Sequence, residues 1–357
     1  MVSRMGGRNV IEIAYGHLMK RFLSQIPDVR NELFGFSIIS VILFHFCEDV
    51  CSAKLGGAAE TAATVYNSVI GSNGVEIFLF LSGMGLFYSL SSDSNIRSFY
   101  RKRLLRILPV YLLLGSVGWL VLDILIRQKG ILSFLYDFST LSFWTEGVRT
   151  VWYISFILIM YLLFPLIYRL IAIPSKRLAG AAVTALLTVW IAVCMSLSFL
   201  VPDVYNNIEI ALWRAVPFVI GAWYGISFRR GESVAAQSVI LCALGAVFVA
   251  VYHAAGYDPG FLWGVFRLRF ANLFYPYVVL FAATAVLVLC GGSRFLRSVG
   301  AASLELYLSH VIIRVIMKEL GLPTCYPLNY LLCAALSVAL SYAVHRLIKC
   351  LQNKRKN

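Results

Sequence analysis

The chain has 357 residues, of which 60% are hydrophobic and only 13% are charged, with a mean hydropathy of +0.80. Soluble domains are about half apolar and about a quarter charged, so this composition excludes an ordinary soluble enzyme and indicates an integral membrane protein. The net charge of +14 would favour nucleic-acid binding in a soluble chain, but the placement of the basic residues explains it better. We therefore expect no nucleic-acid partner. Eight scattered cysteines lack the spacing of a zinc site, so we also expect no metal.

Apolar segments fill most of the chain and predict an all-α fold, a polytopic bundle of transmembrane helices. We divide the chain into a cytoplasmic or interfacial segment at 1–32, a transmembrane domain at 33–348 and a basic cytoplasmic tail at 349–357. Within the first segment, Ile11–Leu23 is expected to form a short amphipathic helix in the membrane interface. The ten predicted spans are 33–50, 74–91, 107–126, 151–173, 179–201, 209–228, 233–253, 268–291, 299–319 and 327–347.

Basic residues alternate between the connections in a way that predicts the orientation of the chain. With the amino terminus inside, most of the 31 Lys and Arg residues fall in cytoplasmic segments, such as 97–106 and 346–356. The opposite connections at 202–208 and 254–265 hold none. This is the pattern of the positive-inside rule, so both termini should be cytoplasmic. We expect a multi-pass protein of the cytoplasmic (inner) membrane.

The first predicted span carries ionisable side chains near its far end, in the run LFGFSIISVILFHFCED at 33–49. On a helix, His45 lies above or below Glu48 and Asp49 on the same face. A carboxylate can fix the tautomer of an imidazole and raise its basicity, so this is a candidate proton-handling unit. Ionisable groups in a span are costly and indicate function by default. The alternative is that His45 only bonds a neighbouring helix while both carboxylates stand among the headgroups.

The second span opens with GVEIFLFLSG at 74–83. Glu76 should lie at the outer membrane boundary, on the same side as His45, where a lone carboxylate could simply be solvated. Ser82 and Gly83 lie mid-membrane, where small residues allow close contact between helices.

A basic block, FYRKRLLRILPVY at 99–111, precedes the third span, whose start we place at Pro109. Arginine clusters suit phosphate recognition because the guanidinium fork matches phosphate oxygens. A nucleotide-like molecule such as coenzyme A fits this block. Anionic lipid headgroups, or topology control alone, also explain it, and the residues alone favour these simpler explanations. The candidate phosphate-binding residues are Arg101, Arg103 and Arg106.

Later segments add candidate substrate-binding residues. Trp152 and Tyr153 could stack against sugar rings, although an interfacial aromatic belt is the commoner explanation. Glu305 and His310 form a second polar stripe in the ninth span and indicate a hydrated internal cavity. Arg214 lies deep in the sixth span and needs a partner. The carboxylates considered for it are Asp123, Glu209 and Glu305.

Five blocks follow one another along the chain: FGFSIISVILFHF, GVEIFLFLSG, FYRKRLLRILPVY, VWYISFILIMYLLFPL and SLELYLSHVII. In this order they resemble the acyltransferase-3 family, which comprises bacterial integral-membrane O-acetylases and related O-acylases of cell-surface sugars. The resemblance covers about residues 30–348. Each block alone is weakly specific, but five in order on a ten-span profile are together strong.

The resemblance implies an acyl donor, usually acetyl-CoA on the cytoplasmic side, and a hydroxyl acceptor on an extracytoplasmic or lipid-linked carbohydrate. No permanently bound cofactor is implied. The family's first-span histidine matches His45, which would act as general base or covalent acyl relay, with Glu48 or Asp49 orienting its ring. The acidic residue of the second block matches Glu76. The basic block matches Arg101, Arg103 and Arg106.

Two positions depart from the family pattern. Members often carry an arginine eleven residues before the histidine, where this chain has Phe34, and many carry a glutamate where it has Ile157. Arg30, one turn before Phe34, is a candidate replacement for the missing arginine. The rival function is a transporter or flippase for a lipid-linked sugar with a His/Glu proton relay. Transporters often show paired halves with broken helices, and no such pairing is visible in the sequence.

Overall fold

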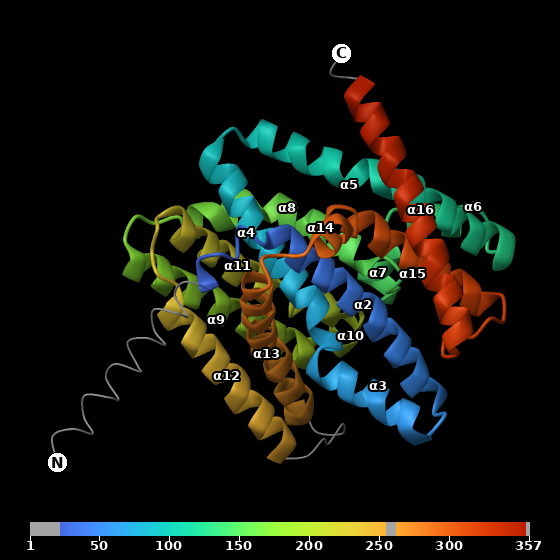
Figure 1. Ribbon diagram of the computed structural model, residues 1–357, viewed down its shortest axis with the longest axis horizontal. Coiled ribbons are helices and arrows are strands. Elements are labelled where there is room, and N and C mark those ends of the chain that lie inside the picture. Colours follow the sequence, from blue (N-terminus) through green and yellow to red (C-terminus); the bar gives the residue numbers. More distant parts are fainter. Residues whose placement is uncertain (1–21, 255–261, 355–357) are drawn as a thin grey trace.

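The structure is a computed structural model that describes residues 22–254 and 262–354. Every regular element in these two ranges is a helix, which confirms the all-α prediction (Figure 1). The amphipathic helix predicted for Ile11–Leu23 lies almost wholly outside the described residues, as does the centre of the connection at 254–265. The last helix runs to Lys354, so the first part of the predicted tail continues that helix.

The elements are named in chain order as Figure 1 labels them. Their bounds are α2 Arg30–Ala53, α3 Gly57–Val69, the 3-10 turn η1 Gly71–Asn73, α4 Gly74–Ser92, α5 Ile96–Trp119, the π-helix η2 Leu120–Ile126, α6 Ile131–Phe138, α7 Leu141–Glu146, α8 Trp152–Ile171, α9 Lys176–Leu200, α10 Pro202–Leu212, α11 Ala215–Arg229, α12 Ala235–Ala254, α13 Leu262–Leu289, α14 Arg294–Ala301, α15 Ser303–Glu319 and α16 Pro327–Lys354.

Eight helical segments among the described residues are long and apolar enough to cross a membrane, whereas the sequence predicted ten. The difference arises at two places. In α12 the apolar part covers only Ala235–Val251, which is short for a bilayer crossing of about 20 residues. At 299–319 the predicted straight span is instead a pair of helices, α14 and α15, bent by 69°. If that bent pair counts as one span, the total is nine.

The third span begins earlier than the sequence predicted. The side chain of Asn95 caps α5 by accepting a hydrogen bond from the backbone N–H of Ser98 at 3.0 Å, and the helix starts at Ile96. Pro109 therefore lies inside α5 and not in its first turn. Membrane helices tolerate an internal proline because neighbouring groups satisfy the freed carbonyl. As a result, the basic block is part of the helix and its side chains project at helical spacing.

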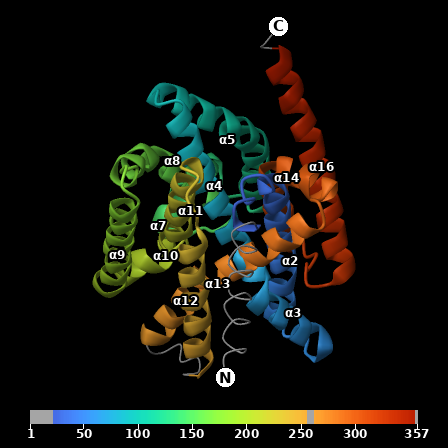
Figure 2. The ribbon, with the colours of Figure 1, turned by 60° about the vertical axis from the view of Figure 1, so that its left-hand side comes forward.

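Helix α2 lies at the centre of the bundle, in contact with α3, α4, α13, α14 and α15 (Figures 1 and 2). In both views the α12–α13 pair lies at one edge and α16 at the opposite edge. Gly35 allows α14 to approach α2 very closely, because a Cβ atom there would lie 2.0 Å from the carbonyl oxygen of Leu296. Arg297 of α14 also donates to the buried Glu32 carboxylate at 2.6 Å.

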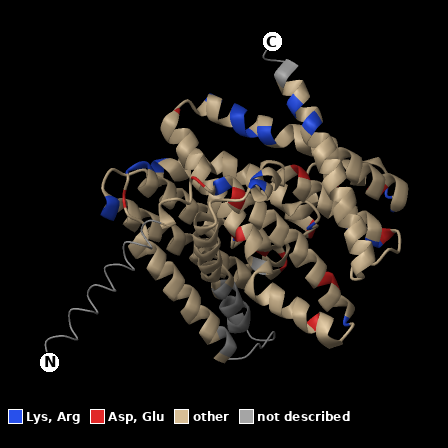
Figure 3. Cartoon of the chain, in the orientation of Figure 1, with Lys and Arg blue, Asp and Glu red and all other residues tan. Residues whose placement is uncertain are grey.

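Contacts between connections agree with the sidedness that the basic residues predict. Lys176 donates to the backbone oxygen of Ser233 at 3.0 Å, which links two connections predicted to be cytoplasmic. Asn207 donates to the backbone oxygen of Thr145 at 2.7 Å, which links two predicted to be external. Figure 3 shows the basic residues of α5 and of the end of α16 gathered at one end of the molecule, away from the α2–α3 junction.

Helices α4 and α11 pack with their backbones nearly touching. A Cβ atom added at Gly83 would lie 1.9 Å from the carbonyl oxygen of Phe218, and one at Gly221 would lie 2.0 Å from that of Phe80. The close helix contact predicted at Gly83 is therefore confirmed.

We predict that Gly83→Ala lowers the free energy of unfolding by about 1–3 kcal/mol, because the obstructing atom belongs to the backbone and cannot move aside. The thermal midpoint of the purified protein in detergent measures this loss. Gly180→Ala is the matched control, since its Cβ would meet Trp223 at an ordinary 3.6 Å. Equal midpoints for the two variants would contradict the prediction.

Candidate active site

His45, near the C-terminal end of α2, meets one side chain of its own helix and one of α15. Its Nδ1 atom lies 3.2 Å from Oε2 of Glu48 and 3.1 Å from Nη1 of Arg314. Arg314 also donates to Glu48 through Nη2 at 2.8 Å, which closes a triangle of polar contacts. The side chains of His45 and Arg314 are only 21% and 12% exposed, whereas Glu48 is 45% exposed, so the triangle lies at the border between the buried interior and solvent.

The chemistry of the two partners limits where the ring proton of His45 can lie. A guanidinium only donates hydrogen bonds, whereas a carboxylate only accepts them. Nδ1 therefore either carries the proton and donates to Glu48, or carries none and accepts from Arg314. In the first arrangement the lone pair is on Nε2, where it can take a proton from a substrate. Of the two carboxylates predicted to orient this ring, Glu48 is the one that contacts it.

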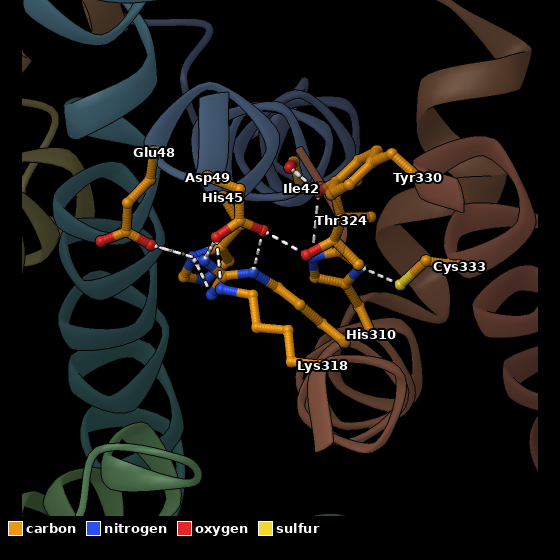
Figure 4. A network of polar contacts seen from close by, with 10 residues as sticks. Ile42, His45, Glu48, Asp49, His310, Lys318, Thr324, Tyr330 and Cys333 are labelled. Carbon is orange, nitrogen blue, oxygen red and sulfur yellow. Dashed lines mark hydrogen bonds and ion pairs between the residues drawn. The ribbon is translucent and has the colours of Figure 1, made fainter. Parts of the chain in front are cut away.

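Asp49 has a different set of partners. Its carboxylate is 5% exposed and accepts from Nε of Arg314 at 2.8 Å and from Oγ1 of Thr324 at 2.6 Å. A further bond comes from Lys318 (Figure 4). Asp49 thus holds Arg314, which in turn faces His45. Sequence reasoning gave Arg314 no role here, although its place one turn after His310 was visible.

His310, predicted to bind substrate, is fully buried beside His45, with ring centroids 5.7 Å apart. Tyr330 donates its hydroxyl proton to the backbone oxygen of Ile42, so its oxygen accepts from Nε2 of His310 at 3.2 Å. The lone pair of His310 is then on Nδ1, which faces the Cys333 thiol at 3.9 Å (Figure 4). This series of bonds ties α15 and α16 to α2 just before His45.

A small pocket near the start of α2 gathers three arginines. Arg30 enters it from α2, while Arg103 and Arg106 enter from α5. Arg30 is anchored by a 3.3 Å bond to the backbone oxygen of Leu81. Arg101, also predicted to bind the donor, instead lines an open depression on the outside of α5. The other residues of the arginine pocket are Phe78, Ser82, Leu86, Ile107, Tyr153, Tyr161 and Leu304.

A small apolar chamber adjoins the arginine pocket. It extends toward the histidines, because Val41 lies one turn before His45 on α2 and Tyr307 lies one turn before His310 on α15. Tyr153, predicted to stack on sugars, is 7% exposed and forms part of the wall. Three residues line both spaces: Phe78, Tyr153 and Leu304. Ile38, Val41, Val75 and Tyr307 complete the chamber.

Glu76, a candidate catalytic residue by the family resemblance, belongs to a second buried charge cluster. Its Oε1 lies 3.1 Å from Nη2 of Arg214, so Glu76 is a partner of that deep arginine which sequence reasoning did not consider. Trp152, the other predicted sugar-stacking residue, lies under the guanidinium, with its ring centre 5.0 Å from Cζ. Asp123, one of the three proposed partners, pairs with Arg127 at 3.4 Å.

Glu305 does not join His310, although both are on α15. A separation of five residues places them about 140° apart around a helix, so they face different neighbours. Oε1 of Glu305 instead lies 2.7 Å from Nδ1 of His345, a residue of α16 that the sequence did not single out. The pair lines a third cavity, near the end of α16.

Comparison with known proteins gives one match. A family model described as an acyltransferase domain matches residues 35–346, nearly the whole chain. No curated protein and no solved structure matches significantly. The matched range contains His45, His310, Arg103 and Arg106, and it begins after Arg30.

We predict that Asp49→Ala destabilises the protein by about 3 kcal/mol, because it leaves the buried Arg314 charge with Glu48 as its remaining partner. The thermal midpoint in detergent measures the effect. Asp93→Ala is the control, since Asp93 and Lys102 form a pair at 2.9 Å whose side chains are 38% and 55% exposed. That variant should melt like the unmodified protein. A similar loss from both substitutions would argue against the buried network.

Proposed function

This chain belongs to the acyltransferase-3 family, and on that premise we propose that it moves an acyl group, acetyl from acetyl-CoA, to a hydroxyl of an extracytoplasmic or lipid-linked carbohydrate. The observation that carries the proposal is the order of three environments along α2. An arginine pocket comes first, an apolar chamber follows, and His45 with its carboxylate lies beyond.

The spacing along α2 suits a long donor molecule. Arg30, Ile38, Val41 and His45 recur at helical spacing on one face. At 1.5 Å per residue, Arg30 and His45 are separated by about 22 Å. An acyl-CoA carries its phosphates and its thioester at opposite ends of a flexible arm. Such a donor can leave its phosphates among the arginines while its thioester reaches the histidine.

The arginine pocket would hold the diphosphate of the donor. Guanidinium groups from two helices converge there, and a planar fork forms paired hydrogen bonds with phosphate oxygens. Arg30 would supply the cation that family members often carry at the position of Phe34. The Cζ atom of Arg30 lies 4.8 Å from the centre of the Phe34 ring, so Phe34 stabilises the Arg30 cation by a cation–π contact.

His45 would act as the general base. Its Nε2 takes the proton from the acceptor hydroxyl as the hydroxyl oxygen attacks the thioester carbonyl. The carbon–sulfur bond then breaks, and the departing thiolate takes the proton from Nε2. Throughout the reaction, Glu48 accepts a hydrogen bond from the N–H group at Nδ1 and stabilises the ring while the ring is positively charged. In the relay version, Nε2 itself attacks the thioester carbonyl, and the carbon–sulfur bond breaks to release the CoA thiolate. The acceptor hydroxyl then attacks the acyl group, the bond from Nε2 to the acyl carbon breaks, and the hydroxyl proton goes to the thiolate, which leaves His45 neutral again.

The acceptor would approach from the outer side of the cytoplasmic membrane. Around His45 the most exposed charged groups are Glu48, at 45%, and Lys318, at 43%, so the cluster opens toward that side. The arginine pocket lies toward the end that the basic residues assign to the cytoplasm. The donor and acceptor would therefore meet at His45 from opposite faces of the membrane.

We predict that His45→Gln reduces acyl transfer by roughly 10²- to 10⁴-fold, because glutamine keeps much of the size and hydrogen bonding but cannot take a proton near neutral pH. The assay follows radiolabelled acetyl from acetyl-CoA into the carbohydrate fraction of membranes that contain the protein. The amount of protein in the membrane should stay unchanged. Near-normal transfer by the purified variant would disprove the assigned role of His45.

We also predict that Arg103→Gln raises the apparent KM for acetyl-CoA. A charge-assisted hydrogen bond contributes about 1.5–3 kcal/mol, which corresponds to roughly 10- to 150-fold in affinity. Arg97→Gln is the matched control, because Arg97 is on the same helix but outside the arginine pocket. If single variants of Arg30, Arg103 and Arg106 all kept the KM for acetyl-CoA of the unmodified protein, the arginine pocket would not bind the donor. The basic block at 99–111 would then serve only to orient the chain in the membrane.

A further inference from the structure

A third cavity, of about 280 Å³, lies between α5, the start of α15 and the end of α16. It adjoins the arginine pocket, because Arg106 and Leu304 line both. The mechanism described above leaves this space without an occupant.

The charge of the cavity wall is positive. Lys102, Arg106 and Lys349 contribute cations from two helices. Glu305 is the one carboxylate among the described lining residues, and His345 pairs with it at 2.7 Å. Gln352 adds an amide that can both donate and accept hydrogen bonds. This set of groups matches a phosphorylated ligand that also carries a polar ring.

We propose that this cavity binds the phosphorylated nucleoside end of the acyl donor, a site that rests on the function proposed above. A donor that threads its arm past Arg106 and Leu304 must leave its bulkier end in the adjoining space. Lys102 and Lys349 bind the phosphate on the sugar, and Gln352 contacts the edge of the base. Helix α16 is thereby part of the donor site.

The same phosphate chemistry is offered by an anionic lipid headgroup, since basic pockets between membrane helices also bind such lipids. The two sources differ in a measurable way. Removal of a contact to the nucleoside end changes the use of acetyl-CoA only. Removal of a lipid contact changes activity with any donor and depends on the lipid composition.

The test compares acetyl-CoA with S-acetyl-pantetheine, which lacks the nucleotide, using full-length protein in nanodiscs. Lys349→Gln should raise the KM for acetyl-CoA about tenfold, as expected for loss of a charge-assisted bond, and leave kcat unchanged. Its KM for S-acetyl-pantetheine should equal that of the unmodified protein. Arg346→Gln is the control, because Arg346 is on the same helix but packs over the Tyr342 ring at 4.6 Å and does not line the cavity.

An equal loss with both donors would overturn the proposal, as would a loss that appears only in nanodiscs with phosphatidylglycerol. Titration calorimetry with adenosine 3′,5′-bisphosphate provides a readout that does not require acyl transfer. The unmodified protein and Arg346→Gln should bind it alike, and Lys349→Gln about tenfold more weakly. Absent or equal binding would overturn the nucleoside site. Failure of acyl transfer from either donor, with this binding intact, would instead count against the proposed function.

Discussion

The arrangement around the two histidines depends on one buried interaction, the ion pair between Asp49 and Arg314. Charges within a membrane domain are stable only when they are paired and hydrogen-bonded. Asp49 achieves this with bonds from α15 and from the Thr324 hydroxyl beyond it. Because both carboxylate oxygens are engaged, α2 and α15 cannot slide past one another without breaking several bonds. The bonds to Asp49 therefore position Arg314 for its contact with His45.

Polarity changes twice along α2, from charged to apolar and back to charged. The arginine pocket and the histidine cluster are charged, whereas the chamber between them is lined by apolar and aromatic side chains. This apolar wall strengthens the buried electrostatic interactions because little water screens them, whereas Glu48 and Lys318 at the histidine end are partly exposed. In the proposed reaction, the same wall would limit the access of water to the thioester and so favour transfer over hydrolysis.

Helical periodicity was sufficient to predict the part of the site that lies on one helix. His45 and Glu48 are one turn apart, and the structure places them in contact. The separation of Glu305 from His310 follows from the same periodicity, but the sequence interpretation grouped them as one stripe. Contacts between different helices could not be predicted from neighbouring residues in the sequence. Nothing near His45 in the sequence indicates Arg314.

The same limit explains the other differences between prediction and structure. Arg214 was recognised as a costly charge in a span and Glu76 was placed at the membrane boundary, yet only the packing of α4 on α11 shows that they pair. Hydropathy located the apolar segments but could not detect the 69° bend between α14 and α15, because both sides of the bend are compatible with one helical pattern. The family blocks were recognised because they depend on residue order, which the sequence contains directly.

Helix α2 is continuous between Arg30 and His45, so it fixes both the distance and the rotation between these two side chains. Insertion or deletion of one residue between them would rotate one end relative to the other by about 100° and shift it by about 1.5 Å. The arginine would then leave its pocket, or the histidine would turn away from Arg314. The number of residues between these two positions is therefore constrained as tightly as their identities, and related chains that use the same geometry should vary in length elsewhere.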